Sequence, residues 1–138
     1  MDRAMELVDD VVPTEPPELM SRALDLATAS MVENGLTGVH EAGTSLDMLG
    51  MYRRKIEAKE LPIRIYAMAD GMGEALDWLC ANGHFTDPSG RLLMRSVKLY
   101  ADGALGSRGA ALLAPYSDDA DNEGLLFMDA FTLDGQLR

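Results

Sequence analysis

The sequence is poor in the residues that tie a fold together covalently or anchor it in a membrane. It has one cysteine, Cys80, so no disulfide framework is possible, and the single thiol is expected to be a small buried side chain. No apolar run approaches the roughly 18 residues typical of a membrane span. Residues 1–6 lack the basic stretch and apolar region of a signal peptide. These absences predict a cytoplasmic protein that does not bind a membrane.

Positive charge is also scarce. Lys and Arg number 12 against 23 Asp and Glu, which gives a formal net charge of -11. Nucleic acid and anionic lipid are bound by clustered Lys and Arg, so neither is an expected partner. A hydrophobic fraction of 47% is ordinary for a globular chain.

Helical periodicity alternates with short apolar runs along the chain. Thr14 and the prolines after it suit a helix start, Asn34-Gly35 and Asn82-Gly83 suit helix ends, and Ser45 suits a helix cap. Residues 41–44 look like a turn. We expect helices at 18–33, 46–59 and 73–81, and strands at 36–40, 63–69 and 92–100.

This alternation indicates βαβ units and a parallel sheet, hence an α/β fold. A complete (β/α)8 barrel needs about 250 residues, so residues 1–138 can form only one partial domain of that kind. Residues 101–130 read as a long loop after a strand, where functional sites of parallel α/β folds assemble. Residues 131–138 look like the start of a further helix.

Lys98 is the residue that most needs an explanation, because it interrupts an apolar strand where a charged ammonium is costly to bury. In a barrel interior its pKa would be depressed, and a neutral amine can react with carbon dioxide to give a carbamate, a bidentate oxygen ligand for divalent metals. The alternative is a lysine whose amine reaches water or pairs with a carboxylate such as Asp102.

Four segments carry a resemblance to a known family. Residues 35–43, 61–68, 97–112 and 115–118 closely resemble the amidohydrolase 3 family, in the branch that includes N-substituted formamide deformylases and exoenzyme-regulatory-protein-like hydrolases. The resemblance covers nearly the whole chain, and its longest motif, Val97 to Leu112, has no gap.

The resemblance implies a segment of a (β/α)8 barrel, about strands 2 to 4 with their helices. It also implies an enzyme that hydrolyses carbon-nitrogen bonds other than peptide bonds in small amide-like substrates through metal-activated water. Lys98 matches the strand-four lysine that is commonly carbamylated in this superfamily, so it is the expected ligand of a divalent metal, most simply zinc. Lys98 and Asp102 are the candidate catalytic residues.

Substrate contacts are expected from five residues: His40, Glu41, Tyr100, Gly103 and Arg108. The planar donors of Arg108 could hold a carboxylate or carbonyl, or they could pair with the acidic residues of the same loop. Asp102 could orient that loop. A single histidine at a strand end, such as His40, is also compatible with a purely structural role.

The sequence departs from the family pattern in its metal ligands. The His-x-His pair of the first strand and the later histidines and aspartate are absent, and His84 lies in a turn-rich surface connection. Because a catalytic zinc takes about three protein ligands, the isolated chain is expected to be inactive.

Two readings from other classes stay open. The spacing Gly103-x-x-Gly106-x-x-Gly109 after a strand could present amides to a phosphate or nucleotide. Alternatively, the chain could be a non-catalytic fragment that associates with itself into a homo-oligomer through exposed sheet edges.

Overall fold

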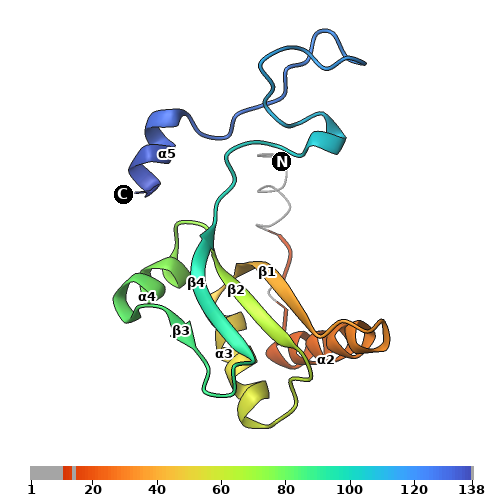
Figure 1. Ribbon diagram of the computed structural model, residues 1–138, viewed down its shortest axis with the longest axis vertical. Coiled ribbons are helices and arrows are strands. Elements are labelled where there is room, and N and C mark those ends of the chain that lie inside the picture. Colours follow the sequence, from red (N-terminus) through yellow and green to blue (C-terminus); the bar gives the residue numbers. More distant parts are fainter. Residues whose placement is uncertain (1–10, 14, 138) are drawn as a thin grey trace. The chain divides into compact units, whose positions relative to one another are not determined.

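The computed structural model describes residues 11–13 and 15–137, and these fall into two compact units. The first is Pro13–Leu99, and the second combines Met1–Val12 with Tyr100–Arg138. Figure 1 shows the elements of the first unit: helices α2 (Pro17–Glu33), α3 (Leu46–Glu57) and α4 (Glu74–Asn82), and strands β1 (Gly38–Thr44), β2 (Arg64–Asp70), β3 (Phe85–Thr86) and β4 (Leu92–Lys98).

The four strands form one sheet in the order β1-β2-β4-β3. The pairs β1-β2 and β2-β4 are parallel, whereas the two-residue β3 runs antiparallel to β4. The expected α/β fold with parallel strands is therefore confirmed, and the arrangement is that of a segment of a (β/α)8 barrel. The short β3 was not expected, because two residues are too few to show a periodic pattern.

The expected helix ends are confirmed where the structure describes them. Ser45 caps α3 by accepting a hydrogen bond from the Met48 amide at 3.2 Å, and Pro17 occupies the first turn of α2. Gly35 and Gly83 follow α2 and α4 with φ of 79° and 77°, a conformation that glycine adopts without strain. Thr14, expected to cap α2, lies outside the described residues, and Pro16 occupies that position instead.

Two local expectations were wrong. Residues 41–44 do not form a turn but complete β1, because a bulge between Ala42 and Thr44 lets Gly43 adopt a φ of 129° without ending the pairing with β2. Cys80 is exposed on α4 rather than buried.

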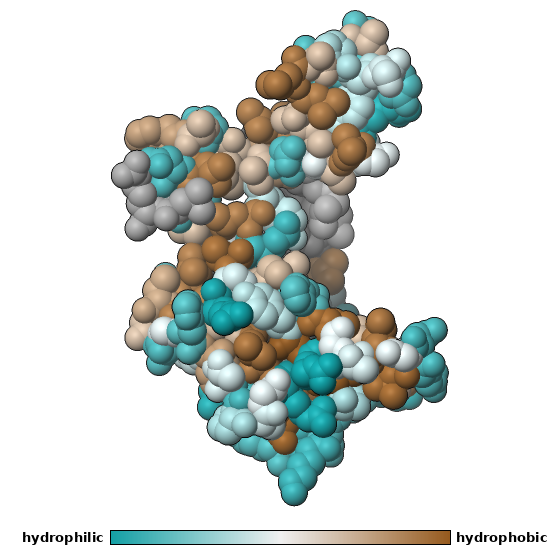
Figure 2. Space-filling model, viewed as in Figure 1, coloured by the Kyte–Doolittle hydropathy of each residue, from teal (hydrophilic) through white to brown (hydrophobic). Residues whose placement is uncertain are grey.

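The core of the first unit lies between one face of the sheet and the helices. Figure 1 shows α3 behind the parallel strands. Alternate residues of β2 are buried, and Leu92 and Met94 of β4 have no exposed surface. They pack with α3, α4 and the segment between α3 and β2, through Leu49, Tyr52, Leu61, Ile63, Ala75 and Leu79. Figure 2 shows hydrophobic and strongly hydrophilic side chains adjoining one another over this unit.

The second unit contains little regular structure: a 3-10 turn η1 (Leu105–Ser107) and helix α5 (Ala130–Leu137), which confirms the expected helix near the C-terminus. Backbone bonds join distant parts of the intervening loop, from Leu125 N to Gly109 O at 3.0 Å and from Phe127 N to Ala101 O at 2.9 Å. Across the described residues of the whole chain, no helix is long and apolar enough to span a bilayer.

Candidate functional site

Lys98 ends β4 on the sheet face that the helices do not cover. Its neighbour Val97 packs against the core, and successive side chains of a strand point to opposite faces, so Lys98 projects from the other face. Asp70, the last residue of β2, is paired with Lys98 in the parallel register. In a closed barrel this face would line the interior, at the carboxyl end of the strands where active sites form.

His40 lies on the same face of the sheet, closer to the amino end of the parallel strands. It is paired with Tyr66 in the register, and their ring centroids are 4.9 Å apart. Tyr66 precedes Asp70 by four residues, which corresponds to about 13 Å along the strand. The structure therefore places His40 and Lys98 on one face without bringing them into contact range.

Tyr66 is surrounded by donors that the sequence interpretation missed. The guanidinium of Arg95 lies 5.8 Å from its ring centroid, and the polar side chains of Ser96 and Arg95 beside it lower the pKa of the Tyr66 phenol. The alternation of side chains along residues 64–70 could have revealed Tyr66, because it places Tyr66 and Asp70 on the same face of the sheet.

Asp70 is a further residue at the carboxyl edge that sequence reasoning missed. A Cβ at Gly43 would lie 3.4 Å from its carboxylate oxygen, so Asp70 reaches across to the bulge of β1. The bulge, Asp70 and Lys98 thus mark the same edge of three neighbouring strands.

Glu41 faces the helices, and so it points away from the face that carries His40. It lines a cavity with residues of α2 and α3, and its charge contributes to raising the pKa of Tyr52. His40 and Glu41 are adjacent in the sequence, but their side chains point to opposite faces of the sheet. They therefore cannot contact the same ligand.

In the second unit, Asp102 holds the loop that follows β4. Its Oδ2 accepts a hydrogen bond from the Ala111 amide at 3.1 Å, and its backbone forms an antiparallel bridge with Leu126. This geometry supports the loop-orienting role considered for Asp102. Tyr100 is largely exposed at the start of this unit.

Arg108 is engaged with an acidic residue of its own loop. Its Nε and one terminal nitrogen donate to the two carboxylate oxygens of Asp118, at 3.1 and 2.9 Å. The pair raises the pKa of Arg108 and lowers that of Asp118. A substrate carboxylate would have to replace Asp118 to use the same donors.

The glycines of this loop allow close backbone approach. A Cβ on Gly103 would lie 2.5 Å from the carbonyl oxygen of Gly109. The amides of Arg108 and Gly109 donate to Leu105 and Ala104 carbonyls at 3.0 and 2.9 Å, so neither amide is directed at an anion. These contacts favour a structural role for Gly103 and Gly109 over a phosphate cradle.

The described residues do not form a complete metal centre. Among them, no group of three or more His, Cys, Asp or Glu side chains is placed to hold a metal ion, and His84 is exposed before β3. Because a catalytic zinc takes about three protein ligands, Lys98 could supply only one part of such a site.

Comparisons with known proteins agree with this arrangement. The sequence model of the amidohydrolase family matches residues 1–133. The Bacillus subtilis protein YtcJ, named as an amidohydrolase, is 29% identical over 99% of this chain. Two similar crystal structures are described as uncharacterized metal-dependent hydrolases. The one from Pyrococcus horikoshii has a TM-score of 0.76 and 28% identity over 94% of the chain. The one from Pyrococcus furiosus has a TM-score of 0.73 and 25% identity over 93% of the chain. The chain spans 26% of YtcJ and 26% and 27% of the two structures.

Proposed function

This chain belongs to the amidohydrolase family, and we propose that it forms part of the barrel of a metal-dependent enzyme that hydrolyses carbon-nitrogen bonds other than peptide bonds. Small amides or formamides are the proposed substrates. The observation that carries the proposal is the position of Lys98, at the carboxyl end of a parallel strand on the face opposite the helices. The likeness to two metal-dependent hydrolases supports it.

Lys98 is proposed to act as a carbamate. The reaction forms one bond between the neutral Nζ and the carbon of carbon dioxide, and it releases one proton to solvent. The product carries two oxygens on a long side chain, suited to a divalent metal and, in our proposal, to zinc. A bound divalent metal polarises the carbonyl of an amide and activates water for attack. The described residues cannot hold that metal unaided, so the isolated chain is proposed to be inactive.

We propose roles for the other predicted site residues from where each lies in the structure. Asp102 and Gly103 fix the loop after β4, next to Lys98 in the sequence. Arg108 is proposed to release Asp118 and to bind an anionic or carbonyl group of the substrate in its place. Tyr100 is proposed to contact the substrate from the start of the loop. His40 lies on the substrate side at a lower level of the barrel wall, whereas Glu41 is assigned to the helix side.

Replacement of Lys98 in the whole protein tests this proposal. Lys98→Ala should lower both the bound divalent metal, measured by elemental analysis, and the hydrolysis of short formamides and acylamides. Lys59→Ala is the matched control, because Lys59 is an exposed lysine just after α3. Metal content and activity that are unchanged in Lys98→Ala would remove this lysine from the site.

Self-association is a second candidate property of the isolated chain. The sheet order leaves β1 at one edge, with half of its backbone groups unpaired by strands of the described residues. A homo-oligomer is therefore proposed for the fragment on its own, and a strictly monomeric species by light scattering would contradict it.

A further inference from the structure

The cavity that Glu41 lines is on the opposite side of the sheet from Lys98, within the first unit. It has a volume of about 230 Å³, is partly open to solvent, and is lined by residues of α2, α3, β1 and β2 and by Ile63 just before β2. Nine of its lining side chains are apolar: Met20, Ala23, Leu24, Ala27, Met31, Val39, Met48, Ile63 and Ile65. The other three are Thr28, Glu41 and Tyr52.

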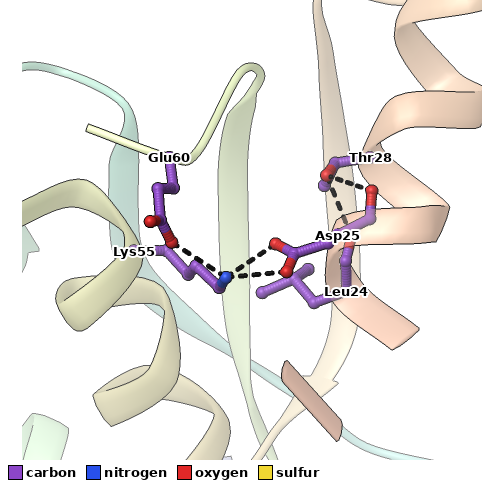
Figure 3. Close-up of polar contacts among 5 residues, drawn as sticks. All are labelled: Leu24, Asp25, Thr28, Lys55 and Glu60. Carbon is purple, nitrogen blue, oxygen red and sulfur yellow. Dashed lines mark hydrogen bonds and ion pairs between the residues drawn. The ribbon is translucent and has the colours of Figure 1, made fainter. Parts of the chain in front are cut away.

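The three polar side chains of this cavity differ in burial and in hydrogen bonding. The Thr28 hydroxyl donates back to the carbonyls of its own helix, at 2.9 Å from Leu24 and 3.2 Å from Asp25, so it is already used (Figure 3). Tyr52 has only 2% of its surface exposed. Glu41 is half-buried, and no Lys or Arg lines the cavity. The wall therefore offers one negative charge and one buried phenol to an occupant.

Burial and the charge of Glu41 together raise the pKa of Tyr52 to about 12. Burial is the larger cause and the charge of Glu41 the smaller one. The carboxylate and the phenol line the same cavity, so both are available to one guest.

An ion pair joins the two helices beside the cavity. Lys55 of α3 lies 2.7 Å from Asp25 of α2 and 3.0 Å from Glu60, with 12% of its side chain exposed (Figure 3). This contact joins α2 to α3 three residues before Thr28, which lines the cavity.

The size and chemistry of the cavity select a class of ligand. Apolar cavities of about 150 Å³ can take up benzene, so a volume of about 230 Å³ suits a guest of roughly seven heavy atoms. An apolar guest complements most of the wall, and a cationic end group can form a charge-assisted contact with the half-buried carboxylate of Glu41. We propose that this cavity is a binding site, separate from the Lys98 face, for a small alkyl- or arylalkylammonium ion whose charged end contacts Glu41.

Binding of hexylammonium, 1-hexanol and hexanoate to the folded chain tests the proposal. With methionine methyl groups labelled with 13C, Met20, Met31 and Met48 should shift on titration, while the methionines outside the cavity should not. Hexylammonium should bind about tenfold or more tightly than hexanol, as expected for a charge-assisted contact, and hexanoate most weakly.

Three variants sharpen the test. Glu41→Gln should remove the preference for ammonium over alcohol and leave hexanol binding within about twofold, whereas Glu33→Gln, a carboxylate at the end of α2 outside the cavity, should change neither. Ala27→Leu should fill the space and abolish binding, with circular dichroism reporting whether the helices persist. Equal affinity for all three probes, shifts at other methionines, or no binding would each overturn the proposal.

Discussion

Different interactions stabilise the two units of this chain internally. All residues of the described chain that are classed as buried lie between Thr28 and Met94, in the unit made of sheet and helices. From Tyr100 to Gln136 no residue is buried to that degree, and order comes from backbone hydrogen bonds, the Arg108–Asp118 pair and close glycine contacts.

The two units should therefore tolerate substitutions at different kinds of position. A core of aliphatic side chains loses free energy with every buried methyl group removed, whereas a loop held by polar bonds depends on a few backbone positions that admit no side chain. A loop of that kind can present residues such as Asp102 and Arg108 without demanding an apolar core of its own.

The largest effect should come from the core of the sheet. Leu92→Ala removes a side chain with no exposed surface and is expected to lower the free energy of unfolding by about 2–5 kcal/mol. Leu113→Ala, at a fully exposed position of the loop, should change it by less than about 0.5 kcal/mol. Urea denaturation of both variants measures the contrast, and similar losses would break the comparison.

A backbone position should dominate the second unit. Gly124 has a φ of 80°, and a Cβ there would collide with the Ala110 carbonyl oxygen, so Gly124→Ala should disorder the loop. Gly106→Ala is the control, because nothing lies near that position. Amide spectra should show large changes among residues 100–127 for Gly124→Ala and small ones for Gly106→Ala; equal changes in the two variants would contradict this.

Alkaline pH should weaken the first unit through Tyr52. Its folded pKa of about 12 exceeds that of an exposed tyrosine, so the stability gained from the neutral phenol is complete below pH 10 and is lost between pH 10 and 12. Tyr52→Phe should flatten this part of the stability profile. Tyr66→Phe removes a phenol whose pKa is shifted the other way and should not flatten it. A slope that persists in Tyr52→Phe would show that another group is responsible.

The smallest effect should come from the exposed pair in the loop. The pKa of Asp118 is lowered by Arg108, so its contribution is present above the ordinary carboxyl pKa and fades as the pH falls through the lower folded value. Asp118→Asn should increase amide exchange in the loop at neutral pH only slightly, since exposed ion pairs contribute little. Asp121→Asn, another exposed carboxylate of the loop, should leave exchange unchanged, and an equal response of both would argue against the pair.

Local signals predicted most of the fold. The Ser45 cap, the prolines before α2 and the glycines after α2 and α4 act through neighbouring backbone groups, which a sequence displays directly. The bulge at Gly43 could not be read in the same way, because a glycine within a strand and a glycine in a turn look alike until the pairing with β2 is known.

The site was less predictable than the fold. Lys98 stood out because a charge in an apolar strand is unusual. Its face depends on a register shift in β4 between Met94 and Val97, because strict alternation from Met94 would have turned Lys98 toward the core. Asp70 and Tyr66 depend on register, and the partner of Arg108 depends on how a loop closes on itself, neither of which follows from spacing. The assignment of Glu41 to the helix side needed the direction of each side chain in β1.

The central claim is that Lys98 belongs to a metal centre on the uncovered face of the sheet. A crystal structure of the whole protein, grown with zinc and bicarbonate and with anomalous data collected at the zinc edge, addresses it directly. The account predicts an anomalous peak beside the Lys98 side chain and density for a carboxylate on its Nζ. Zinc bound elsewhere in a complete barrel, with an unmodified Lys98 directed into solvent, would contradict it.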